Sequence, residues 1–412
     1  MSYLTERDKK MTKIEIKIFD FIKKHLLFIG FIAITVLGLV LRFFGMEFES
    51  GDFFVFLKPW WEQIKTSGLG ALSTQVGNYN IPYQIIIFLM SLLPIEPIIG
   101  YKMLSIIFDI ILSVCAAKLV YEFNSKENKF LALITYAVTF CSITVVLNSA
   151  FWSQCDSIYV SFILLSIIFI LKDKAIPSFI MLGVALAFKL QVIFILPFFV
   201  FYYVLTRKIS ILHFLIIPAV DFVMCLPALF FGRNPMDIIK VYFDQTNDTK
   251  RMYSNIPNFY AFMVDYNDEA KYTLLKGFSI FLTFTVLTIV LIIMIQKGID
   301  LSDRRIFLLT AVWTVFTSVM LLCSMHDRYA YLLDILVIIY ALAYRKNIWV
   351  AVLCNLISLR CYCYYLFDLY QVLDLKWASL FYIATYAYVT FTFLKDIITK
   401  PKSIKKPEAK TV

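Results

Sequence analysis

The sequence predicts an all-α protein that crosses a membrane many times. Of its 412 residues, 61% are hydrophobic and only 17% are charged, whereas soluble domains contain roughly 45–50% apolar residues. The hydrophobic residues form successive continuous runs of about 17 to 23 residues, the length that a helix needs to cross a bilayer core. Continuous runs also exclude a transmembrane β-barrel, whose strands alternate apolar and polar residues.

Residues 1–25 are predicted to form a cytoplasmic amphipathic segment. Within "MTKIEIKIFDFIKKHL", Ile14, Ile18, Phe21 and Ile22 share one helical face and lysines surround it. This pattern is typical of a helix that lies in the membrane interface. The next apolar run exceeds signal-peptide length, so we expect no cleaved signal.

Residues 26–394 are predicted to form a transmembrane domain. Apolar runs bounded by charged residues give about twelve spans. They cover residues 26–45, 99–121, 130–149, 156–171, 175–188, 189–206, 210–230, 274–296, 306–323, 329–344, 348–367 and 377–394. Residues 81–94 are apolar but too short to cross, so a re-entrant or interfacial segment is expected there.

The distribution of lysine and arginine predicts that both termini are cytoplasmic. With the N-terminus inside, about 24 basic residues fall on the cytoplasmic side and about 13 on the other. Residues 395–412 then form a basic cytoplasmic tail, and the net charge of +10 reflects membrane orientation. Two long connections, residues 46–98 and 231–273, face outward and are expected to fold as short helices.

The first of these connections carries two acids, Glu49 and Asp52, next to an aromatic-rich run. Asp52 has two interpretations. It is either a solvated loop carboxylate or the cap of the helix that follows, or it serves as a general base, because a partly desolvated carboxylate can accept a proton from a hydroxyl. Glu49 fits a structural role better.

The segment "SMHDRYAY", residues 324–331, gathers charge at the end of a span. His326, Asp327 and Arg328 form either an interfacial anchor, in which the acid and the arginine pair, or a phosphate site. Arginine offers a fork of donors to an anion and histidine adds another. We favour the phosphate site.

Two further polar groups lie at the predicted outer ends of spans. Lys189, in "FKLQ", either extends toward the membrane surface or is buried and needs an anion as partner. Trp152, Gln154 and Asp156, in "FWSQCDSIY", form either an aromatic belt with a helix cap or a sugar-binding set.

Motifs of soluble enzymes do not occur. The chain has no P-loop, no GxGxxG, no GxSxG elbow and no histidine spacing typical of a metal site. We therefore expect neither a cofactor nor a metal. A divalent ion near Glu49, Asp52 and Asp156 is the less favoured alternative, because carboxylate sites need no fixed spacing.

Taken in order, these motifs resemble the GT-C superfamily of polytopic glycosyltransferases. Within it, the chain looks closest to bacterial relatives of the dolichyl-phosphate-sugar glucosyltransferases and of the glycosylphosphatidylinositol (GPI) mannosyltransferases. "SGDFFVFLKPWWEQI" resembles the acidic motif of the first loop, "NYNIPY" the Tyr/Pro motif that closes it, "FKLQVIFILP" a later Phe-Lys span, and "MHDRY" the His-acid-basic motif. The resemblance covers most of the chain and departs at Asp327, where many members have glutamate.

The resemblance implies a GT-C-like fold with a large first extracytoplasmic loop and a hexosyltransferase activity in polysaccharide biosynthesis of the cell envelope. Such an enzyme takes a sugar from a polyprenyl-phosphate donor and passes it, with inversion, to a lipid-linked or envelope glycan at the extracytoplasmic face of the cell membrane. Its partners are these two substrates and membrane lipid, without nucleic acid. The implied roles are catalytic base for Asp52; donor-phosphate binding for His326, Arg328 and Lys189; and sugar or acceptor binding for Trp152, Gln154, Asp156 and Tyr83.

Two rival classes share this composition. A transporter or flippase for polyprenyl-linked glycans has a similar number of spans with buried polar groups, and a non-catalytic subunit of a polysaccharide assembly machine is the other. The acidic first connection and the gathering of polar residues at one face favour the enzyme. The motifs fix neither the sugar nor the acceptor.

Overall fold

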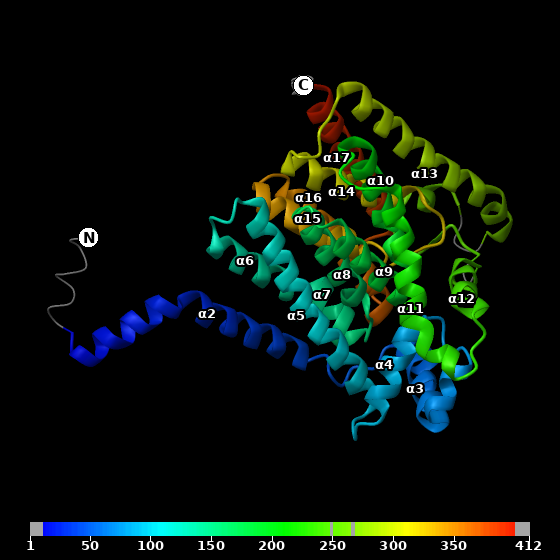
Figure 1. Cartoon of the computed structure of the whole chain (residues 1–412), viewed down its shortest axis with the longest axis horizontal. Coiled ribbons are helices and arrows are strands. Elements are labelled where there is room, and N and C mark those ends of the chain that lie inside the picture. The colour runs from blue at the N-terminus through cyan, green and yellow to red at the C-terminus, as the bar shows by residue number, and fades with distance from the viewer. Residues whose placement is uncertain (1–10, 248–249, 265–267, 400–412) are drawn as a thin grey trace, which may run out of the picture.

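Helices make up nearly all of the regular structure. A computed structural model describes residues 11–247, 250–264 and 268–399. Within these ranges the strands are β1 (Tyr253–Ser254) and β2 (Met325–His326), which pair in parallel. The prediction of an all-α protein is confirmed (Figure 1).

Seven helices in the described ranges are long and apolar enough to cross a membrane. An eighth span results if α6 (Lys129–Phe140) and the helical piece Ile143–Phe151 that follows it, which are bent by 49°, count as one. The seven are α2 (Lys13–Phe43), α5 (Pro97–Phe123), η6 with α11 (Ile211–Phe230), α13 (Glu269–Lys297), α14 (Arg304–Leu321), α16 (Ile348–Phe367) and α17 (Leu375–Thr399). The protein is therefore a multi-pass membrane protein.

Shorter apolar helices complete the bundle. They are α4 (Ile81–Ser91), α8 (Asp156–Ile170), α9 (Ala175–Phe188), η5 with α10 (Leu190–Thr206) and α15 (Tyr331–Tyr344). Each of the twelve predicted ranges contains helix, with α6 (Lys129–Phe140), α7 (Ile143–Val146) and η4 (Leu147–Phe151) in the third. A count of twelve crossings and the placement of both termini inside stay predictions.

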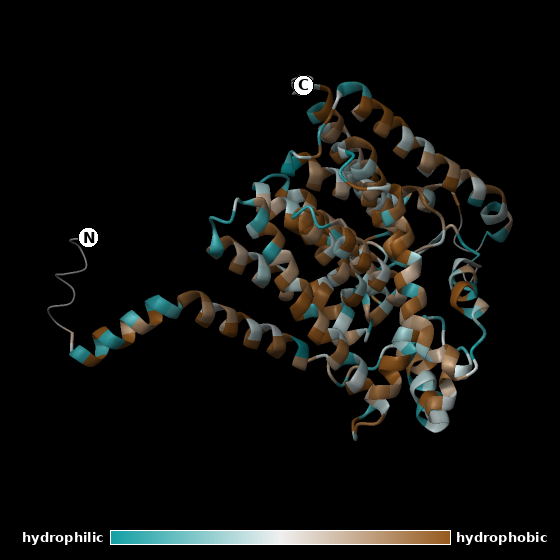
Figure 2. Ribbon diagram, in the orientation of Figure 1, coloured by the Kyte–Doolittle hydropathy of each residue, from teal (hydrophilic) through white to brown (hydrophobic). Residues whose placement is uncertain are grey.

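The helices differ widely in how much of their surface other helices cover. In the most apolar window of α14, 89% of the residues are buried inside the protein, against 11% in α2. α2 runs outward from the body and is apolar along its second half (Figures 1 and 2). A bilayer is the natural environment for such a helix, since its exposed apolar side chains have no protein partner.

A buried ion pair joins the C-terminal end of α2 to α5. Arg42 donates to Asp109 at 2.8 Å, and the two side chains are 1% and 0% exposed. The same guanidinium donates to the carbonyls of Gly38 and Phe140, both at 2.9 Å. Just beyond, the buried Lys102 amine donates to the carbonyl of Gly45 at 2.7 Å. These contacts set the position from which the first long connection starts.

Both long connections fold as short helical pieces, as predicted. The first contains η2 (Phe53–Leu57), α3 (Lys58–Ser67), η3 (Gly68–Ser73) and α4; the second contains α12 (Met236–Asn247), β1 and η7 (Phe259–Phe262). Arg233 joins the two connections by donating to the carbonyls of Leu72 and Thr74. Strand β1 pairs Ser254 with His326 of β2. Both connections meet the segment between α14 and α15 at one end of the bundle: the first through Asp52, which accepts from Arg328, and the second through β1.

Candidate active site

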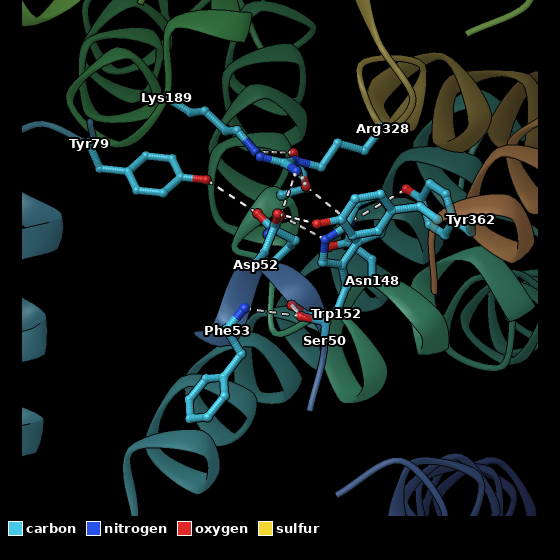
Figure 3. Close-up of polar contacts among 12 residues, drawn as sticks. Ser50, Asp52, Phe53, Tyr79, Asn148, Trp152, Lys189, Arg328 and Tyr362 are labelled. Atoms are coloured by element: carbon cyan, nitrogen blue, oxygen red, sulfur yellow. Dashed lines mark hydrogen bonds and ion pairs between the residues drawn. The ribbon is translucent and has the colours of Figure 1, made fainter. Parts of the chain in front are cut away.

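Asp52 begins the π-helix η2, but its side chain does not cap that helix. The Ser50 hydroxyl does so instead, because it accepts the Phe53 N–H at 3.3 Å. The same hydroxyl donates to the Trp152 carbonyl at 3.4 Å and so ties the start of η2 to a distant part of the chain. The capping interpretation of Asp52 is therefore wrong, and its carboxylate faces a cavity (Figure 3).

Four donors from three separate segments surround the Asp52 carboxylate. Oδ2 accepts the Trp152 indole N–H at 2.8 Å, the Gln154 amide at 2.9 Å and the Arg328 guanidinium at 3.3 Å. Oδ1 accepts the Tyr365 hydroxyl. A carboxylate that is 17% exposed and held by four donors is fixed in one orientation (Figure 3).

The segment that supplies Trp152 and Gln154 is a tight turn between η4 and α8. Ser153 adopts a positive φ of 63°, which turns the chain so that both neighbouring side chains reach Asp52. The Trp152 ring is 1% exposed and stacks on Tyr365 at 4.5 Å between centroids. Trp152 is thus no interfacial belt residue, and it orients Asp52 directly.

A second carboxylate, Asp156, lies behind the first and is buried. It pairs with the Lys189 amine, accepts the Asn148 amide at 3.0 Å and lies 3.7 Å from Arg328 Nε. Lys189 is 3% exposed. Its backbone is extended, with φ −157° and ψ 131°, and this breaks the chain between α9 and η5 so that the amine turns inward. Of the two interpretations of Lys189, burial with an anionic partner is the one the structure shows.

Arg328 connects the two acids. Its guanidinium reaches Asp52 on one side and Asp156 on the other, and its centre lies 5.4 Å from the centroid of the Trp152 ring. Lys189 and Arg328 together therefore balance the two carboxylates, a pairing that buried charges require. The interfacial-anchor interpretation of Arg328 does not hold, because the side chain points into the protein and is 19% exposed.

The two residues before Arg328 titrate far from their usual range. Burial, together with the nearby Arg328 charge, lowers the pKa of His326 to about 4, so the imidazole is neutral at pH 7. Burial raises the pKa of Asp327 to about 7, against the opposing effect of Arg328. Near neutral pH, His326 is thus an uncharged donor or acceptor, and Asp327 is a half-protonated acid.

A polar cavity of about 560 Å³ is lined by Asp52, Trp152, Gln154, Lys189, Tyr365 and the segment His326–Arg328. An apolar groove of about 580 Å³ adjoins it and shares Gln191, Gln245 and Tyr329 with it. Other side chains of the cavity wall are Phe56, Trp60, Tyr79, Arg251, Ser254, Asn255 and Tyr364. The groove runs between η5, α10, α13 and α14. The site therefore joins a charged chamber to a long apolar channel.

Six of the eight predicted site residues line the cavity: Asp52, Trp152, Gln154, Lys189, His326 and Arg328. Asp156 lies behind the wall and acts through Lys189 and Arg328. Tyr83 does not line the cavity; it is 2% exposed and packs against Tyr79 and Tyr101. Tyr83 is therefore not placed to contact a sugar in this cavity. Tyr79 of the same motif lines the cavity instead.

Sequence reasoning missed Tyr365, Asn148 and Arg251. Tyr365 stands in "RCYCYYLF", where nothing separates it from its aromatic neighbours. Tyr79 donates to Gln154 at 3.2 Å. It belongs to the motif "NYNIPY", in which the other tyrosine, Tyr83, is the predicted site residue. Glu49 is exposed and outside the cavity wall. No group of three or more acidic, histidine or cysteine side chains in the described residues is arranged to hold a metal ion.

Comparisons with known proteins give no family for this chain: no family model matches the sequence, and no curated protein matches it either.

Proposed function

We propose that the protein is a membrane glycosyltransferase that moves a hexose from a polyprenyl-phosphate donor to a hydroxyl of an extracytoplasmic glycan acceptor, with inversion. One observation carries the proposal: a fixed carboxylate and two cations share a polar cavity that opens into an apolar groove. A donor with a charged head and a hydrocarbon tail matches this pair of compartments.

In this proposal Asp52 removes the proton of the acceptor hydroxyl. Asp52 Oδ2 accepts three hydrogen bonds from described residues, whereas Oδ1 accepts one, from Tyr365, and keeps a lone pair for a further donor. The second position on Oδ1 is where the acceptor hydroxyl binds. As the acceptor oxygen attacks the anomeric carbon, Oδ1 takes the proton, and the bond between that carbon and the phosphate oxygen breaks with its electron pair on the phosphate.

The leaving phosphate gains negative charge, so donors that are already in place lower the barrier. Arg328 and His326 lie on the same short segment beside Asp52, and Lys189 comes from the break after α9 and meets Arg328 at Asp156. His326 contributes as a neutral imidazole, since its pKa of about 4 keeps it uncharged at pH 7. Arg328 and Lys189 contribute positive charge.

The apolar groove supplies the site for the lipid tail. Along α13 its wall extends from Lys276 to Leu291, a rise of about 22 Å at 1.5 Å per residue. That is a large part of the roughly 30 Å hydrocarbon core. A polyprenyl chain in the groove therefore stays within the bilayer while its phosphate reaches the cavity.

The position of the cavity favours an enzyme over a flippase. Asp156 begins α8, Lys189 follows the end of α9, Arg328 precedes α15, and Tyr365 lies in the last turn of α16. The charged residues of the cavity thus gather at one end of the bundle, together with both long connections. We place this end at the extracytoplasmic face, with about twelve spans and both termini inside, in agreement with the basic-residue distribution.

A reconstituted transfer assay tests the donor class. The purified protein in proteoliposomes is given a lipid-linked glycan acceptor extract and either a polyprenyl-phosphate hexose or the corresponding nucleotide hexose, and products are followed by mass spectrometry. We expect a mass increase of one hexose with the lipid donor alone. Transfer from the nucleotide sugar, or movement of the lipid donor across the bilayer without transfer, would contradict the proposal.

A further inference from the structure

We propose that Arg251 binds the phosphate of the lipid donor, at the boundary between the polar cavity and the apolar groove. This inference rests on the proposed function and adds a residue that the motifs do not contain. Arg251 belongs to the second long connection, between α12 and β1, and its side chain lines the cavity.

The charges of the cavity call for a further cation. Lys189 pairs with Asp156, and Arg328 pairs with Asp52 and approaches Asp156, so these two cations are matched by two anions. The half-ionised Asp327 on the same wall adds further negative charge. His326 adds no positive charge at pH 7 because its pKa is about 4. A phosphate that enters such a chamber gives up its hydration without a net attraction. Among the described side chains of the wall, Arg251 is the third permanent cation.

The position of Arg251 fits the place where a lipid phosphate has to lie. The junction of cavity and groove is marked by Gln191, Gln245 and Tyr329, which line both. Arg251 lies on the cavity side of this junction, since it lines the cavity and not the groove. Two residues after Arg251 the chain enters β1, where Ser254 pairs with His326, and the Arg251 charge contributes to the lowered pKa of His326. Arg251 therefore lies beside His326 on the cavity wall.

The chemistry of the side chain also suits the task. A guanidinium binds two phosphate oxygens through parallel N–H donors, which a lysine amine cannot do. A second arginine on the cavity wall adds its donors to those of Arg328 and can hold the donor phosphate before reaction. It then retains the phosphate as the charge grows on bond breaking.

Binding measurements on the full chain in lipid nanodiscs test this inference. The probes are polyprenyl phosphate and the uncharged polyprenol of the same chain length, and their dissociation constants are compared for the parent, Arg251→Gln and Arg251→Lys. The matched control is Lys250→Gln, since Lys250 is 67% exposed, pairs with Glu269 at 3.0 Å and lines neither compartment.

We expect Arg251→Gln to weaken binding of polyprenyl phosphate by about tenfold, the effect of one charged hydrogen-bonded contact. Binding of polyprenol stays unchanged, Arg251→Lys is intermediate because it keeps the charge, and Lys250→Gln matches the parent. The intermediate value for Arg251→Lys separates a lost charge from a misfolded site.

Equal affinity of the parent and Arg251→Gln for polyprenyl phosphate would overturn the inference. So would a loss that appears in Lys276→Gln instead, because Lys276 lines the groove and would place the phosphate there. A different result would contradict the proposed function itself: the parent would then bind polyprenyl phosphate no more tightly than polyprenol.

Discussion

Asp52 is fixed before any substrate arrives. Trp152 and Gln154 hold one oxygen, and the stacked Tyr365 holds the other. A base in a rigid frame needs no reorganisation during reaction, which is one way in which enzymes lower barriers. Glu49, three residues earlier, is exposed and has no such frame. Of the two acids in the first connection, only Asp52 is held in place on the cavity wall, as the proposed base requires.

The neighbouring residues His326 and Asp327 predict opposite effects of pH on stability. Asp327 has a folded pKa of about 7, against about 3.9 in an unfolded chain. Between these values the folded protein holds a proton that the unfolded chain releases, so this residue makes stability fall as pH rises toward 7. His326, with a folded pKa of about 4 and an unfolded value of about 6.5, makes stability rise with pH between these two values.

Single substitutions separate the two effects. Across pH 4.5 to 7 we expect the melting temperature of His326→Gln to decrease with pH relative to the parent, since only the Asp327 effect remains of the pair. Asp327→Asn is expected to show the reverse slope. Thermal unfolding in detergent, followed by tryptophan fluorescence, measures both, and two profiles parallel to that of the parent would show that neither group titrates as described.

At the scale of elements, the break between α9 and η5 and the turn between η4 and α8 build the site. The sequence predicted helices on both sides of each, because long apolar runs are a strong signal. It could not decide whether Lys189 extends outward or is buried, since that depends on an extended backbone at one residue and on Asp156 from another helix. Likewise, two-residue strands such as β1 and β2 leave no pattern in the sequence, because their pairing is fixed by tertiary contacts.

Because Arg42 and Asp109 form a buried ion pair, we expect replacing one of them to lower the unfolding free energy much more than replacing both. Arg42→Leu leaves the buried Asp109 without its cation, and we expect a loss of about 3–5 kcal/mol in unfolding free energy. The double variant Arg42→Leu with Asp109→Leu should recover most of this loss, because two apolar side chains pack together and leave no buried charge unpaired. Denaturant titration in mixed micelles gives both values. A double variant that is as unstable as the sum of its two single changes would argue against coupling between α2 and α5.

At the scale of the whole molecule, the two long connections and four helix ends converge on one chamber. Sequence motifs located six residues of its wall, since each motif has a polar group at the end of a span. They did not locate Tyr365 or Arg251, because aromatic residues make up 17% of the chain and single basic residues are common in its loops. The sequence could not locate the adjoining groove, because its walls are ordinary apolar helix faces that become a channel only through packing.

The central claim is that Asp52 is the base of a sugar transfer, and the rate of that transfer in Asp52→Asn tests it most directly. Asparagine keeps the shape and can still accept hydrogen bonds, but it cannot take a proton. We predict a decrease of about 10²- to 10⁴-fold in the rate of a single turnover, the usual contribution of a general base. Donor binding should remain close to that of the parent, and the exposed neighbour variant Glu49→Gln should retain the parent rate. Transfer by Asp52→Asn at the parent rate would contradict the account.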